Sequence, residues 1–362
     1  MKTLLALFVL VPMAVSATIR TVSNDINKPA QYPDIPPAVA AANSGDTIYV
    51  NGTQYTYSDF TVTKKLVIIG AGYNVANQFN LISMVNNISF FKDAGVNDGS
   101  GTVITGFKIY AIGVSGSSLG ITNIKIFRNQ ISGISANTGT SNWTVYNNLI
   151  TGYLNGANAS SNFIIQNNIF FSGGNVVNFN QPSVVIDHNL FINDSGALSA
   201  LQFAIVTNNI FTSSSNTLVM SNINQCTFNS NMSISTNISS YTPSNSFLAN
   251  GNTGGANQSG SATPTFIGVN PQFVADGDFN TYNNTFNYRL SSGSPGHNAA
   301  SDGTDIGIYG GTYPFPSGGA PGSGYDTSPL PPIPQINSVN IQNASVLPGQ
   351  QLQVNVTATV NN

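Results

Sequence analysis

Apolar and amide positions recur along the middle of the chain with a period near 20 residues. Short β-branched or aromatic stretches alternate with the two-residue period of a strand, and each ends at an Asn. The anchor residues of the repeat are Asn129, Asn148, Asn168, Asn189, Asn209 and Asn231. Their spacings are 19, 20, 21, 20 and 22 residues. This regularity predicts one structural unit repeated along a stack.

Each repeat carries the same pattern around its Asn. A β-branched residue precedes five of the anchors by three positions, and an Ile or Phe follows the same five by two. The short Asn amide tolerates turn conformations that larger residues resist. Stacking would align these amides in a hydrogen-bonded ladder beside a continuous apolar core. The Leu-rich consensus of leucine-rich repeats is absent, so the pattern predicts an all-β solenoid of parallel strands on short coils.

The segment before the repeat predicts a cap. We expect a short helix over residues 35–42, a turn over 43–46, and strands over 47–50 and 65–70. A cap is needed because the first coil would otherwise expose an apolar cross-section and an unpaired strand edge. We assign residues 18–70 to the cap and first coils, and residues 71–315 to the β-helix.

Residues 1–17 have the pattern of a secretory signal peptide. Lys2 precedes an apolar run over 4–15, and Val15-Ser16-Ala17 fits the cleavage site. The apolar run is too short to span about 30 Å of hydrocarbon, and no later stretch approaches that length. We therefore expect a secreted or cell-surface protein without a transmembrane segment after cleavage.

Composition narrows the function classes. Only 6% of residues are charged, 50 are Asn and none is Glu, whereas soluble domains carry about 25% charged residues. A hydrophobic content of 41% argues against disorder. The net charge of −3 with scattered basic residues disfavours nucleic-acid binding. The single cysteine, Cys226, excludes a disulfide scaffold, and we interpret it as a small buried residue.

The pattern changes after residue 315. Residues 316–335 are rich in Pro and Gly, which predicts a semi-rigid linker. Residues 336–362 alternate as two strands around Leu347-Pro348-Gly349-Gln350, which predicts a β-hairpin. It looks like the start of an immunoglobulin-like module, although such a domain needs about 100 residues. Either the chain is a fragment or the hairpin docks on the solenoid.

The repeat and its cap resemble the right-handed parallel β-helix of the pectate-lyase-like superfamily, over roughly residues 46–310. That family commonly opens with a helix followed by segments similar to Ser44–Val50 and Leu66–Gly70. The end of the repeat resembles the choice-of-anchor region that closes many secreted bacterial β-helices. The matching segments are Asn270–Phe273, Tyr288–Leu290, Ser294–Pro295 and Asp305–Gly307. The usual Pro-Ala-Ile-Asp run is replaced by Pro295-Gly296-His297-Asn298, so this match is incomplete.

The resemblance implies where chemistry would lie if the protein were an enzyme. Lyases of this superfamily bind Ca²⁺ on clustered acidic side chains beside a basic residue, and its glycosidases use two or three Asp. The catalytic candidates here are Asp187, His188, Asp194 and Arg128. No Asp-rich cluster is visible in sequence, which favours a non-catalytic protein.

Each candidate also has a structural interpretation. Asp187 and His188 form a solvated surface pair if adjacent strand residues face opposite ways. Asp194 fits a turn. Asp276 and Asp278 resemble a fragment of a calcium loop, but a third acidic ligand is missing nearby. We expect no cofactor, with calcium as the alternative.

A row of aromatic and amide side chains suggests carbohydrate binding. Aromatic rings offer flat apolar faces to sugars, and amides offer paired donors and acceptors. The candidates are Phe127, Trp143, Tyr146, Tyr153 and Gln166. The alternative is that these aromatics merely cover the strands. We therefore predict a non-catalytic module that binds glycans or another surface. The alternatives are a polysaccharide lyase or hydrolase, and a structural spacer. The sequence does not indicate the oligomeric state.

Overall fold

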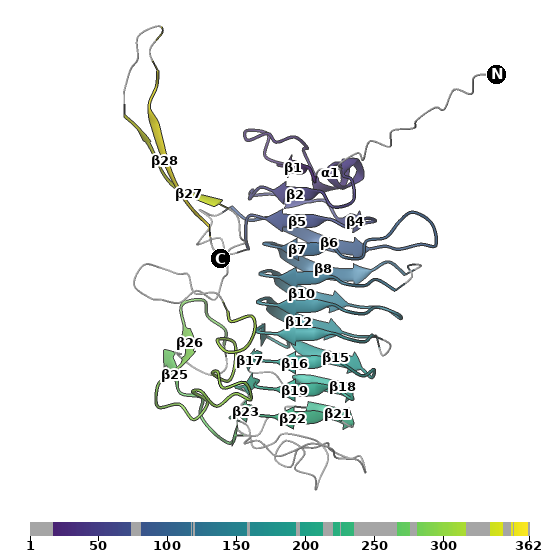
Figure 1. Cartoon of the computed structure of the whole chain (residues 1–362), viewed down its shortest axis with the longest axis vertical. Coiled ribbons are helices and arrows are strands. Elements are labelled where there is room, and N and C mark those ends of the chain that lie inside the picture. The colour runs from purple at the N-terminus through teal and green to yellow at the C-terminus, as the bar shows by residue number, and fades with distance from the viewer. Residues whose placement is uncertain are drawn as a thin grey trace, which may run out of the picture.

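The structure, a computed structural model, is a tall stack of parallel strands (Figure 1). It describes residues 17–73, 81–116, 118, 120–157, 160–192, 196–212, 220–224, 226–234, 266–275, 281–315, 334–342, 349 and 351–360. The predicted signal sequence, apart from Ala17, and most of the predicted linker lie outside these residues. No helix in the described part of the chain is long and apolar enough to span a membrane.

The N-terminal end is closed by a helix, as the pattern predicted. α1 (Ile35–Ala41) begins at Asp34, whose carboxylate accepts the Ile35 amide at 2.7 Å. A Pro in the first helical turn is well tolerated there, because its missing N–H has no intrahelical acceptor. The helix buries Ile35, Ala38 and Val39 against the first coils. This contact covers the apolar cross-section that the stack would otherwise expose.

Two long parallel sheets form the body of the molecule. The first sheet has the order β1-β2-β5-β7-β9-β11-β13-β16-β19-β22. Its strands are β1 (Ile19–Val22), β2 (Thr47–Val50), β5 (Val67–Gly70), β7 (Val103–Thr105), β9 (Lys125–Phe127), β11 (Thr144–Tyr146), β13 (Ile164–Gln166), β16 (Val185–Asp187), β19 (Ile205–Thr207) and β22 (Thr227–Asn229).

The second sheet has the order β24-β23-β20-β17-β14-β12-β10-β8-β6-β3, with β4, β15, β18 and β21 attached. Its strands are β3 (Thr56–Tyr57), β4 (Phe60–Val62), β6 (Met84–Phe90), β8 (Lys108–Val114), β10 (Gln130–Ser135), β12 (Leu149–Asn155), β14 (Ile169–Phe171), β15 (Asn175–Phe179), β17 (Leu190–Ile192), β18 (Leu198–Gln202), β20 (Ile210–Phe211), β21 (Met220–Asn224), β23 (Met232–Ser233) and β24 (Phe266–Ile267). Consecutive coils therefore pair strand to strand, and the fold is the predicted parallel β-helix.

The core lies between the two sheets. Ile126, Val145 and Ile165 pair in register across β9, β11 and β13 and are fully buried. Phe170, Phe191 and Phe211 stack on the other side of the core, with ring centroids 4.6 and 4.8 Å apart. Identical positions thus stack on one another, as the 20-residue period predicted.

The Asn ladder is continuous from Asn129 to Asn231. Each side-chain amide donates to the carbonyl oxygen of the next ladder Asn, at 2.9–3.2 Å. The same oxygen accepts the backbone amide of the preceding Asn at 2.9–3.0 Å. All six residues are fully buried. The ladder therefore satisfies the polar groups at a turn that is closed to water.

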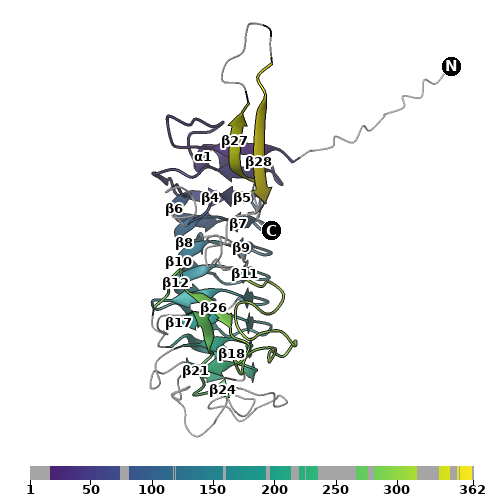
Figure 2. The ribbon, with the colours of Figure 1, turned by 90° about the vertical axis from the view of Figure 1, so that its left-hand side faces the viewer.

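Residues 281–315 pack beside the coils rather than forming further ones (Figures 1 and 2). Here β26 (Asn287–Leu290) pairs antiparallel with β25 (Phe273–Ala275). A second apolar cluster joins this region to the outside of the second sheet. It includes Leu149, Ile169, Leu190, Ile210 and Met232 from the coils, and Tyr288, Leu290, Ile306, Ile308 and Phe315 from the closing region.

The predicted C-terminal hairpin is formed by β27 (Pro334–Ile341) and β28 (Val354–Val360). Ile341 pairs with Val354, and Val339 with Val356, so these four side chains share one face. They are 44–57% exposed. The described part of this apolar face is therefore exposed.

Candidate functional site

A column of outward turn residues fastens the closing region to the coils. Asn147, Asn167, His188 and Asn208 each precede a ladder Asn and have φ between 51° and 57°. In this left-handed conformation, which Asn adopts more readily than most residues, their side chains reach residues 301–315. We call residues 301–315 the strap.

The strap runs against the direction of the coils. Asn208 donates to Ser301 Oγ at 3.0 Å, at the strap's start. Asn167 donates to the carbonyls of Ile308 and Gly310, at 3.0 and 2.8 Å. Asn147, one coil earlier, donates to the Tyr313 carbonyl at 2.8 Å. A single column of side chains thus holds the strap over successive coils.

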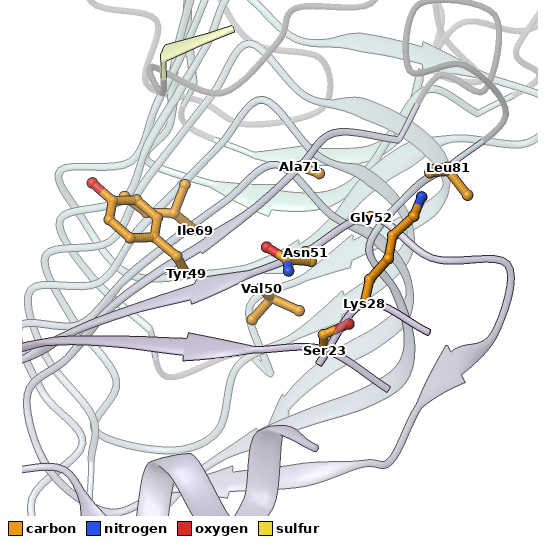
Figure 3. A pocket seen from close by; sticks show the side chains of 9 residues that line it. All are labelled: Ser23, Lys28, Tyr49, Val50, Asn51, Gly52, Ile69, Ala71 and Leu81. Carbon is orange, nitrogen blue, oxygen red and sulfur yellow. The ribbon is translucent and has the colours of Figure 1, made fainter. Parts of the chain in front are cut away.

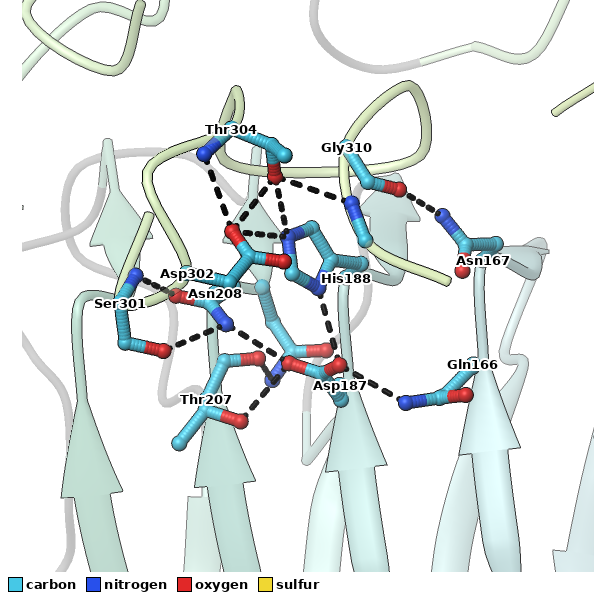
Figure 4. A network of polar contacts seen from close by, with 12 residues as sticks. Gln166, Asn167, Asp187, His188, Thr207, Asn208, Ser301, Asp302, Thr304 and Gly310 are labelled. Carbon is cyan, nitrogen blue, oxygen red and sulfur yellow. Dashed lines mark hydrogen bonds and ion pairs between the residues drawn. The ribbon is translucent and has the colours of Figure 1, made fainter. Parts of the chain in front are cut away.

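Asp187 lies at the centre of the polar network under the strap (Figure 4). Its Oδ1 accepts hydrogen bonds from Thr207 Oγ1 at 2.7 Å and Asn208 Nδ2 at 2.8 Å. Its Oδ2 accepts from Gln166 Nε2 at 2.8 Å. Burial raises the pKa of Asp187, but the contact with His188 and the bonds from Thr207 and Asn208 outweigh burial and hold the pKa below its usual value.

His188 links this carboxylate to the strap (Figure 4). Its Nδ1 lies 2.9 Å from Asp187 Oδ2, a contact that becomes an ion pair only when the imidazole is protonated. Its Nε2 lies 3.3 Å from Thr304 Oγ1 and 3.8 Å from Asp302 Oδ1. The side chain is only 1% exposed. The sequence-based interpretation of a solvated pair is therefore wrong, because the positive φ of His188 breaks the alternation that would separate adjacent side chains.

Asp187, His188 and Thr304 are ordered like the acid, base and hydroxyl of a hydrolase. The Thr304 hydroxyl, however, donates to Asp302 Oδ1 at 2.6 Å, which is much shorter than its contact with His188. Thr304 Oγ1 also accepts the Gly311 amide at 2.9 Å. The hydroxyl proton is thus held by a carboxylate rather than by the base, and the imidazole is covered. The geometry makes this network a fastening for the strap.

Of the other catalytic and metal candidates, Arg128 lies in the described part of the chain. Arg128 is three coils from His188, about 14 Å at the usual strand spacing, and burial lowers its pKa. Asp194, Asp276 and Asp278 lie outside the described residues. Within the described part of the chain, no three His, Cys, Asp or Glu side chains gather as metal ligands.

The strap also covers the aromatic row. Phe127, Tyr146, Gln166 and Asp187 do align in register, and the rings of Phe127 and Tyr146 stack 4.8 Å apart. Tyr313 of the strap stacks on the ring of Tyr146 at 4.3 Å. Burial raises the pKa of Tyr146 to about 12, and the neighbouring Tyr313 adds to the effect. Tyr146 therefore packs against the strap and is only partly exposed.

The remaining sugar-binding candidates separate in the structure. Trp143 is fully buried between Phe90 and Phe163, and its indole N–H donates to the Ile121 carbonyl at 3.1 Å. It therefore has no surface to offer a sugar. Tyr153, on β12, remains 45% exposed. The burial of Trp143 was predictable from the two-residue period of a strand. Trp143 lies two residues before the inward-facing Val145, so its side chain faces inward too.

A groove that the sequence interpretation missed crosses the outer face of the first sheet. It has a volume of about 610 Å³. The strand register places one lining residue from each strand between β9 and β19 in a single row along the floor of the groove. The lining residues are Asn123, Lys125, Asn142, Thr144, Asn162, Ile164, Ser183, Val185 and Ile205. The sequence signal was an Asn two residues before each of three successive strands.

The groove presents hydrogen-bonding groups that the protein itself leaves unused. Asn123, Asn142, Asn162 and Ser183 have φ between 54° and 68°. The side-chain amides of Asn142 and Asn162 make no hydrogen bond within the described part of the chain. Both residues are exposed. Unpaired donors and acceptors therefore recur from one coil to the next beside an apolar floor.

A second pocket of about 550 Å³ lies near the N-terminal cap (Figure 3). Its lining combines Tyr49 and Ile69 of neighbouring strands with Lys28, Asn51 and Leu81 from loops. It spans only the first coils and has no repeated polar row. The longer groove is therefore the better candidate for a functional site.

Comparison with protein-family models and with curated proteins finds no match for this chain. The parallel β-helix is consequently assigned from the strand pairing, and function must be argued from the groove.

Proposed function

We propose that this is a secreted or cell-surface protein that binds a linear polysaccharide along the groove on the first sheet, without cleaving it. The observation that carries this proposal is the repeat of unpaired side-chain amides, Asn142 and Asn162, on adjacent coils. Adjacent coils are about 4.8 Å apart, close to the length of one hexose in an extended chain. Each coil is thus suited to meet one sugar ring.

The chemistry of the lining supports a neutral or acidic glycan. Amides supply both donors and acceptors for hydroxyl groups. Ile164, Val185 and Ile205 supply an apolar strip for the C–H faces of the rings. Lys125 is the single ionisable side chain among the described lining residues. Glycosidases use paired carboxylates, so this lining suits binding better than cleavage. The signal-like pattern of residues 1–17 supports export.

Affinity electrophoresis tests the proposal. The chain, without residues 1–17, is run through gels cast with pectin, alginate, xylan or cellulose derivatives, with and without Ca²⁺. We expect retardation in at least one gel. The double variant Asn142→Gly/Asn162→Gly keeps both backbones unstrained but removes the amides, so it should migrate as in a plain gel. Ser172→Gly, at an exposed position with φ of 58° outside the groove, is the matched control and should be retarded like the wild type.

The same gels distinguish the alternatives. A zone of cleared polymer, or release of new reducing or unsaturated ends, would contradict a purely binding role and support a lyase or hydrolase. Retardation that survives the double variant would place the glycan elsewhere, with Tyr153 the next residue to replace. No retardation with any polymer would favour a structural spacer.

A further inference from the structure

An aromatic residue ends the row of polar turn residues that lines the groove. In four successive coils, the residue two positions before the strand is Asn123, Asn142, Asn162 or Ser183. In the fifth coil, before β19, it is Phe203. Because Val185 pairs with Ile205, Ser183 and Phe203 hold equivalent places on neighbouring coils. The row of amides and hydroxyls therefore ends in a phenyl ring.

Neither the backbone nor the packing explains a Phe at this place. Phe203 has a φ of 60°, a left-handed conformation that Asn accepts and bulky residues rarely adopt. The residue is 41% exposed, and its ring meets no other aromatic ring within the described part of the chain. Phe203 thus combines a conformational cost with incomplete burial of its ring. A strained residue that leaves its ring exposed beside a groove points to a ligand.

The ring of Phe203 continues the apolar floor of the groove. Ile205, two residues further on, is 42% exposed, and Ile164 is 37% exposed. Val185 lies between these two in the same row, and all three line the groove. Phe203 therefore extends an apolar strip at the opposite end of the groove from Lys125.

We propose that Phe203 is a platform on which one sugar ring stacks, and that the ligand is a linear glycan of at least four rings. This inference rests on the proposed function of the groove. The coils of Asn142 and Phe203 are three coil spacings apart, about 14 Å, which four rings span at one ring per coil. The phenyl ring offers a flat apolar face to the C–H groups of a sugar, and the amides of Asn142 and Asn162 bind hydroxyl groups. Because the two ends of the groove differ chemically, the glycan binds in one direction.

The variant Phe203→Asn separates binding from folding. It places at 203 the residue found at 123, 142 and 162, which suits the backbone, so its urea midpoint should equal or exceed that of the wild type. In gels cast with the pectin, alginate, xylan or cellulose derivative that retards the wild type, it should need about tenfold more polymer for the same retardation. Phe203→Trp keeps an aromatic face and should be retarded like the wild type.

A matched control lies on the other sheet. Tyr110, on β8, is 68% exposed, so Tyr110→Asn also removes an exposed ring but leaves the groove intact. It should be retarded like the wild type. Equal losses in Tyr110→Asn and Phe203→Asn would overturn a specific role for Phe203.

Oligosaccharides of two to six units, cut from the same polymer, test the length of the site by competition in the gel. Four units should displace the wild type more effectively than three, and this difference should disappear in Phe203→Asn. Unchanged retardation of Phe203→Asn, with loss in Asn142→Gly/Asn162→Gly, would overturn the platform and leave the groove as the glycan site. A lower urea midpoint in Phe203→Asn would also overturn it, because the ring would then serve packing. A wild-type chain that no gel retards would overturn both proposals.

Discussion

Gly311 lies directly against the imidazole of His188: a Cβ added to Gly311 would be 2.7 Å from Nδ1. Gly311 also has a φ of 74°, which L-residues rarely adopt. Gly303, in the same strap, has a φ of 84° but nothing within 4 Å of its virtual Cβ. The pair of glycines therefore separates backbone strain from contact with His188.

We expect Gly303→Ala to cost about 1 kcal/mol of stability through strain alone. Gly311→Ala should cost at least about 1–3 kcal/mol more, because the strap must move away from His188. Urea unfolding measures the total cost, and limited proteolysis within 301–315 shows whether the strap has lifted. Equal costs for the two variants would mean that the strap does not depend on its close fit over the imidazole.

Replacement of one ladder residue should destabilise the whole stack. Asn168→Ala removes the acceptor of the Asn148 amides and two bonds to the carbonyls of Val145 and Gln166. Several buried polar groups would lose partners, at about 1–3 kcal/mol each. We expect a loss of about 3–5 kcal/mol in urea unfolding. Asn86→Ala, at an exposed strand position, should stay within about 0.5 kcal/mol of the wild type.

Acid should loosen the network around Asp187. Its pKa is held below the usual value of 3.8 in the folded state, so ionisation stabilises the fold above that usual value. This stabilisation is lost as pH falls through the lowered pKa. Urea midpoints measured from neutral pH down to about pH 2 should fall less steeply for Asp187→Asn than for the wild type. Asp25→Asn, in a loop of the cap, should keep the wild-type slope; an unchanged slope in Asp187→Asn would contradict the prediction.

Trp143 offers a spectroscopic check on the assignment of the glycan surface. As the single Trp of the chain, and fully buried, it should emit at short wavelength and resist quenching by iodide. Polysaccharide that retards the protein in gels should leave this emission unchanged. A shift on binding, or easy quenching, would mean that the indole meets solvent or ligand. Trp143→Phe should lower stability without abolishing retardation.

The parts of the molecule that depend on local repetition could be predicted from the amino-acid sequence. A strand alternates its faces every residue, and an Asn every 20 or so residues marks the same turn. Stacking follows because each coil cannot bury its apolar face alone. The helix cap at Asp34 and the hairpin around Gly349 were predictable for the same reason, since capping and turn chemistry act over a few residues.

The side chains that stay exposed on the surface of the stack could not be predicted in the same way, because they depend on how distant segments pack. The strap reaches His188 from Thr304, 116 residues away in sequence, and no local pattern specifies that contact. It converts Asp187 and His188 from apparent surface residues into a buried network and covers Tyr146. The groove likewise depends on register between coils, because Asn142 and Asn162 become neighbours only when β11 and β13 pair. Hydrogen bonds and ion pairs between distant segments form only where the fold brings those segments together. The period of the repeat determines which residues are neighbours within the stack. It does not determine where the strap, which folds back over the stack, makes its contacts.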